Sequence, residues 1–100
     1  MKLTDEMCNE IFAKFPLDVK RWIIAFETHM RAAELNHPNW PTDKIHAAAI
    51  LAEETGELVQ AANQYTYENG RYYSMHLEAT QVGAMALRFL INAPELPFNE

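Results

Sequence analysis

The sequence is poor in cysteine, in basic residues and in long apolar runs. Cys8 is the only cysteine among 100 residues, so no internal disulfide can form and a reducing compartment is expected. The chain has eight Lys and Arg and fourteen Asp and Glu, which gives a formal net charge of −6. It has no cluster of basic residues that would bind a nucleic-acid backbone. The apolar runs are too short to cross a bilayer, and residues 1–6 lack the apolar core of a signal peptide. We therefore expect a cytoplasmic protein with no nucleic-acid or membrane partner.

Glycine and proline are also scarce, and the prolines and Gly70 fall outside the periodic segments. The chain has three Gly and five Pro, and no stretch shows the apolar–polar alternation of a half-buried strand. We predict an all-α fold in one domain over residues 1–100, with Thr4 and Thr42 as helix caps and Cys8 as a small buried side chain. Helices are predicted at about 5–14, 18–35, 43–65 and 71–92, followed by an extended tail over about 93–100.

Three glutamates crowd one face of the helix predicted at about 43–65. Glu53, Glu54 and Glu57 fall within about one quadrant when successive residues turn by ~100°. Like charges at i, i+4 destabilise a helix by about a few tenths of a kcal/mol, and no Lys or Arg occurs between residues 45 and 70 to balance them. A neutralising partner for this face is therefore expected.

The next predicted helix adds Glu78 and Gln81. Both Glu78 and Glu54 lie on otherwise apolar stripes, and a carboxylate on a packing face is costly unless it is protonated, paired or bound to a metal. The turn signal Asn69-Gly70 lies between the two helices. If they pack as an antiparallel hairpin, Glu54, Glu57, Glu78 and Gln81 converge. Such oxygen ligands fit a hard cation, Mg²⁺ first and Mn²⁺ second.

Two other interpretations of this pattern stay open. A polar stripe is usually a solvated helix face, which would make the chain a helical interaction module without a metal. Paired carboxylates also act as general acid and base in glycosidases. A helical domain of 100 residues, however, offers little room for a sugar-binding cleft.

The two clusters together resemble the signature of a known family. Glu53-Glu54-x-x-Glu57, then twenty residues, then Glu78-x-x-Gln81 is similar to the E-E-x-x-E … E-x-x-D signature of the MazG-like family, in the all-α nucleoside triphosphate pyrophosphohydrolase superfamily. The resemblance covers about residues 44–90, within a motif core of about 43–92. It implies a helical bundle, assembled as a homodimer or homotetramer, with a two-helix hairpin that carries the metal site. It also implies Mg²⁺-dependent hydrolysis of a nucleoside triphosphate to a monophosphate and pyrophosphate.

The resemblance further implies roles for individual residues. By position in the signature, Glu54, Glu57 and Glu78 would be the principal metal ligands. Glu53 would be an additional ligand or would orient a metal-bound water. Gln81 stands where the family usually has Asp, so it offers a carbonyl oxygen without a charge. A nucleotide-binding or regulatory relative without turnover is therefore an alternative function.

Four more residues are candidates for substrate binding. Arg88 follows Gln81 by two helical turns, close enough to reach a phosphate, and the simpler interpretation is a solvated arginine. Lys44 and His46 lie near the start of the helix that carries the glutamates, where a surface position is the simpler interpretation. Trp40 lies between two prolines, where it would stack on a base or cover the core.

Overall fold

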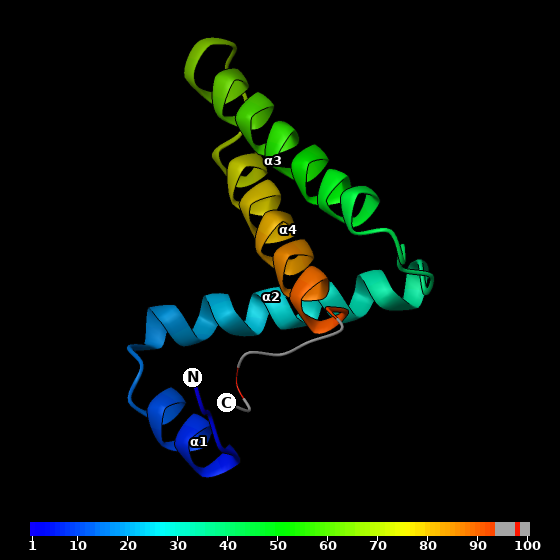
Figure 1. Ribbon diagram of the computed structural model, residues 1–100. Coiled ribbons are helices and arrows are strands. Elements are labelled where there is room, and N and C mark those ends of the chain that lie inside the picture. The colour runs from blue at the N-terminus through cyan, green and yellow to red at the C-terminus, as the bar shows by residue number, and fades with distance from the viewer. Residues whose placement is uncertain (94–97, 99–100) are drawn as a thin grey trace.

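The computed structural model describes residues 1–93 and Phe98, and within these residues it contains four α-helices and no strand (Figure 1). The predicted all-α fold is confirmed, and the helix ends lie within about two residues of their predicted places. The predicted tail falls mostly on residues 94–97 and 99–100, which lie outside the described residues. The helices are α1 (Asp5–Ala13), α2 (Leu17–Asn36), α3 (Lys44–Tyr67) and α4 (Tyr72–Ile91).

Side-chain caps fix the starts of α1 and α3. The Thr4 hydroxyl accepts a hydrogen bond from the Met7 amide at 3.2 Å, which confirms the predicted cap. At α3 the prediction of Thr42 is wrong, because Asp43 is the cap and its carboxylate accepts two amides of the first turn at 2.8 and 3.2 Å. A carboxylate also places negative charge at the positive end of the helix, which a threonine cannot do.

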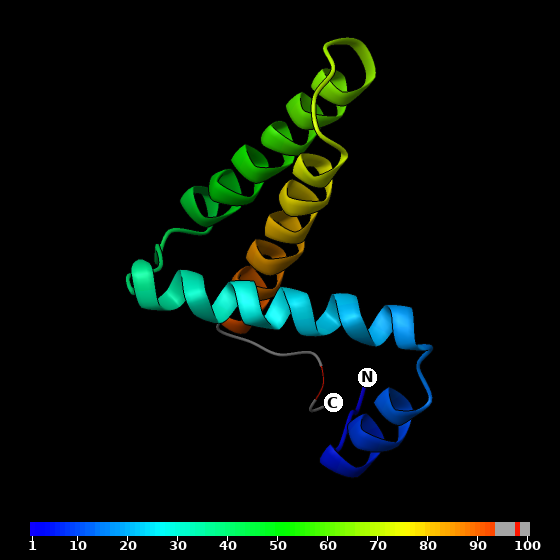
Figure 2. The same ribbon diagram turned by 180° about the vertical axis from the view of Figure 1, so that it is seen from behind.

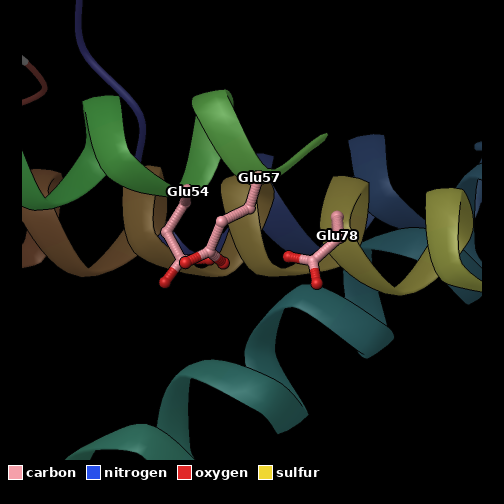
Figure 3. A group of neighbouring side chains, drawn as sticks. All are labelled: Glu54, Glu57 and Glu78. Atoms are coloured by element: carbon pink, nitrogen blue, oxygen red, sulfur yellow. The ribbon is translucent and has the colours of Figure 1, made fainter. Parts of the chain in front are cut away.

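A tight turn folds α3 back onto α4 as an antiparallel hairpin. Asn69 adopts a left-handed conformation with φ of 59°, and the Gly70 amide donates to the Gln64 carbonyl at 2.8 Å. A Cβ on Gly70 would lie 2.7 Å from the Gln64 backbone, so only glycine fits this turn. The hairpin predicted from Asn69-Gly70 is therefore present, and it sets Glu57 and Glu78 on facing helices (Figures 1 and 3).

Helix α2 crosses the C-terminal half of α4, as both views show (Figures 1 and 2). Gly83 permits this approach, because a Cβ there would lie 2.5 Å from the Phe26 ring. The crossing buries a small core of Met30, Ala84 and Met85. Helix α4 thus packs against both α2 and α3.

The chain is open in shape and buries few apolar side chains. Its radius of gyration is 15.7 Å, against about 13 Å for a compact domain of this length. Helix α1 lies beside the start of α2, away from the hairpin (Figure 2), and Cys8 on it is exposed, so the prediction of a buried Cys8 is wrong. No helix in the described part of the chain is both long and apolar enough to cross a membrane. Within residues 1–93 and Phe98, the buried apolar residues are Met30, Ala47, Ala61, Ala84 and Met85.

Candidate metal centre

The hairpin brings together the carboxylates of Glu54, Glu57 and Glu78. One oxygen of each lies within 4.8 Å of the others (Figure 3). The first two are one helical turn apart on α3, and Glu78 comes from the facing turn of α4 (Figure 3). The three side chains point toward one another on the side of the hairpin that faces α2 (Figure 3). The cluster is therefore a product of helix periodicity and of the turn at Asn69-Gly70.

In the described part of the chain, no group of opposite charge pairs with this cluster. Among residues 1–93 and Phe98, the ion pairs are those that Arg31 makes on α2 with Glu27 and Glu34. One carboxylate oxygen of Glu78, Oε2, is buried and has no hydrogen-bond partner. An unpartnered carboxylate oxygen of this kind is costly, and a bound cation would remove the cost.

The protonation of two of the carboxyls responds to this crowding. Burial raises the pKa of Glu54 above its usual 4.5, and the negative charges of Glu57 and Glu78 raise it further. Burial also raises the pKa of Glu78, with a second contribution from Glu57. Removal from water and mutual repulsion both disfavour three negative charges in this cluster. Without a metal, the ionised carboxylates therefore destabilise the fold.

We expect the metal-free protein to lose stability as the pH rises above about 4.5, the pKa of both carboxyls in the unfolded chain. The folded state binds these two protons more tightly than the unfolded chain does. The stabilisation that results is fully present below about pH 4.5 and is lost as the pH rises through the raised pKa of the folded state. The double variant Glu54→Gln, Glu78→Gln should show a shallower decline of melting temperature between pH 4.5 and 8 in EDTA. Equal slopes for variant and parent would contradict this expectation.

The donor set of the cluster fits Mg²⁺ or Mn²⁺. All three side chains offer hard carboxylate oxygens, the ligand type these cations prefer. Two oxygen ligands on opposite sides of Mg²⁺ are about 4.2 Å apart. The carboxylate oxygens of the cluster lie within 4.8 Å of one another, so small side-chain adjustments would let all three bind one ion. Glu57 is exposed and Glu54 and Glu78 are partly buried, which leaves an open side for water and a ligand.

Glu53 and Gln81 take different places from these three. Glu53 is exposed on α3 and is not part of the group whose oxygens converge. The side-chain amide of Gln81 is partly buried, and its Nε2 lies 3.1 Å from Nδ1 of His29. Gln81 therefore links α4 to α2 across 52 residues of sequence, in addition to the metal-ligand role predicted for it.

The four predicted substrate-binding residues fall in two places. Arg88 and Trp40 line a cavity of about 410 Å³ that also includes Glu54 and Gln81. Arg88 is buried, so its interpretation as a solvated arginine is wrong. Lys44 is exposed and lines a second cavity of about 570 Å³, which Trp40 also lines. His46 is exposed and lines neither cavity.

Sequence reasoning missed the α2 side of the smaller cavity. His29 lies two turns before the end of α2, and the loop that follows supplies His37 and Asn39. The run Asn36-His37-Pro38-Asn39 is a visible concentration of polar side chains, but no periodicity relates it to glutamates on α3. The crossing of α2 over α4 is what brings these residues beside Glu54.

The chain was compared with protein-family models, with curated proteins and with solved structures, and none of the three comparisons gave a match.

Proposed function

We propose that the protein is a Mg²⁺-dependent nucleoside triphosphate pyrophosphohydrolase, with Mn²⁺ as a second possible ion. The observation that carries the proposal is the convergence of Glu54, Glu57 and Glu78 from two helices, with no ion pair to any of them among residues 1–93 and Phe98. The buried and unpartnered oxygen of Glu78 is independent support, because it points to a missing ligand. The resemblance to the MazG-like signature supports the choice of reaction.

In this proposal Glu54, Glu57 and Glu78 hold the ion through their carboxylate oxygens. The ion, when bound, supplies positive charge that neutralises the phosphates and favours deprotonation of water. Water oxygen forms a bond to the α-phosphorus, the bond from that phosphorus to the bridging oxygen breaks, and pyrophosphate leaves with the electron pair. Glu53, which is exposed and next to Glu54 in sequence, orients the attacking water and takes its proton, so that Glu53, Glu54, Glu57 and Glu78 form the proposed catalytic set.

A nucleotide-binding relative without turnover is the alternative, and one observation favours it. Gln81 replaces the usual aspartate of the signature, and its amide is engaged with His29 at 3.1 Å. A neutral side chain at this position gives the centre one negative charge less than the signature supplies. Such a protein would bind a metal–nucleotide complex and leave it intact.

The test is a screen for pyrophosphate release. The full chain is incubated with Mg²⁺ and a panel of canonical and modified nucleoside triphosphates, and both products are quantified. We expect equal amounts of monophosphate and pyrophosphate from at least one substrate, and no product in EDTA. If the protein binds metal and nucleotide but forms no product with any member of the panel, it is a nucleotide-binding relative without turnover. If it binds no metal, the remaining interpretation is a helical interaction module.

We also propose that a second copy of the chain covers an apolar groove beside the carboxylates, in a homodimer or as one interface of a homotetramer. The accessible surface is 7711 Å², about 1,900 Å² more than a compact monomer of this mass exposes. A stable interface needs about 800 Å² per partner, so the excess is large enough. The groove, of about 410 Å³, is lined in part by Leu58 and Ala79, each next in sequence to a carboxylate of the cluster. Its other lining residues are Trp22, Phe26, Tyr72, Met75, His76 and Thr80.

Placing a charge in this groove should separate the copies. Trp22 is 45% exposed and packs on His76 with a ring separation of 5.6 Å. We expect sedimentation to give a dimer or tetramer for the parent and a monomer for Trp22→Asp, because an unpaired carboxylate in a dry interface is costly. Thr28→Asp, an exposed change on another face of α2, is the matched control and should not alter the mass. A monomeric parent at about 100 µM would contradict the proposal.

A further inference from the structure

Arg88 is a cation buried inside the protein without an anion. It is 4% exposed, and no carboxylate of the described residues lies within ion-pair distance of it. Its Nη2 donates to the His37 carbonyl at 2.6 Å, and its guanidinium lies 4.8 Å from the centre of the Trp40 ring. Its Nε is buried with no hydrogen-bond partner. A buried charge in this state is costly unless an anion joins it.

The cavity that Arg88 lines is polar at both ends, with opposite charges. Glu54 and Gln81 lie on the side of the metal centre, and Arg88 follows Gln81 by two helical turns, about 10 Å along α4. The carboxylate and the guanidinium share one cavity of about 410 Å³, and they do not pair. Apolar residues also line the cavity, among them Ile50, one helical turn from Glu54, and Met85, which lies between Gln81 and Arg88 in sequence. Such a cavity suits a ligand that carries a cation at one end and an anion at the other.

From this arrangement we infer that the cavity between α2, the loop at residues 37–41 and α4 is an anion subsite, in which Arg88 binds a phosphoryl group. The planar guanidinium presents its donors to phosphate oxygens in a fixed geometry. The Trp40 ring packs against the guanidinium of Arg88, and the His37 carbonyl accepts a hydrogen bond from Nη2 of the same group. Both contacts hold the guanidinium in place. Arg88 is not one of the proposed metal ligands, although Glu54 lines the same cavity. The subsite rests on the proposed function only for the identity of the metal-bound end of the ligand.

A metal-free binding assay tests the subsite without relying on turnover. Inorganic phosphate and pyrophosphate are titrated into the full chain in EDTA, at constant ionic strength set with chloride, and affinity is measured by calorimetry and by melting temperature. We expect a specific rise in melting temperature in the parent. Arg88→Met should weaken phosphate binding about tenfold or more, and Arg88→Lys should weaken it less because the charge remains. Glu54→Gln should strengthen it, because the repelling carboxylate at the other end of the cavity is gone.

Arg71→Gln is the matched control, since Arg71 is an exposed arginine at the start of the same helix and should leave phosphate affinity unchanged. A nucleoside monophosphate, titrated alongside, distinguishes the sources of the phosphoryl group. Tighter binding of the nucleotide than of phosphate assigns the subsite to substrate, and equal binding assigns it to free phosphate. A parent that responds no more to phosphate than to chloride, or an Arg88→Met variant that keeps the response, would overturn the proposal. The proposed pyrophosphohydrolase activity would survive that result, because it depends on Glu54, Glu57 and Glu78.

Discussion

Replacing Glu78 with Gln is expected to lower pyrophosphate release by about a hundredfold to a thousandfold, at an unchanged helix content. Glu78 is the one carboxylate that α4 contributes to the cluster, and its buried Oε2 has no hydrogen-bond partner in the described residues. Loss of a residue that only orients a metal ligand already costs about 10–100-fold, and a residue that itself holds the ion contributes more. The amide keeps the shape of the side chain and removes the charge, so the change isolates metal binding from packing.

The same replacement should raise the melting temperature of the metal-free protein at pH 7. Burial and the charge of Glu57 hold the pKa of Glu78 above its ordinary value, which means that the ionised form destabilises the fold. Gain of stability together with loss of activity is the signature of a functional carboxylate. Glu68→Gln, at the exposed C-terminal end of α3, is the matched control and should change neither quantity. A Glu78→Gln variant with full activity would remove this residue from the site.

Saturation with Mg²⁺ or Mn²⁺ is expected to raise the melting temperature of the parent by about 10–20 °C. A ligand that binds only the folded state at about a hundred times its Kd stabilises by about 2.7 kcal/mol, and each kcal/mol corresponds to about 4–8 °C in a domain of this length. The measurement is a thermal melt at increasing metal concentration, starting from EDTA. The rise comes from relief of the repulsion among Glu54, Glu57 and Glu78.

Two variants give this metal experiment its controls. Glu54→Gln should abolish most of the metal-dependent rise, because only two charged ligands remain. Gln81→Asp restores the charge that the signature carries, and it should increase metal affinity if residue 81 reaches the ion after release from His29. An identical melting temperature of the parent with and without either metal would contradict a metal centre at this position.

The helices and the hairpin were predictable because their determinants are local. Thr4 caps α1 through an amide three residues away, and Asn69-Gly70 supplies the left-handed turn that a hairpin of two helices needs. The exchange of Thr42 for Asp43 as the cap of α3 is a shift of one residue between two side chains of similar capping ability. The exposure of Cys8 was not predictable, because the burial of a residue on α1 depends on whether α1 packs on another element.

The sequence by itself determined an acidic all-helical chain whose glutamates recur on the facing sides of two helices. Periodicity and a turn are enough to bring Glu54, Glu57 and Glu78 within 4.8 Å of one another. Only the tertiary structure decided what lies beside them. The angle at which α2 crosses α4 depends on contacts between residues far apart in the chain, such as Phe26 over Gly83. That crossing pairs Gln81 with His29 and buries Arg88 beneath Trp40 in the cavity that adjoins the carboxylates, and no local pattern encodes it.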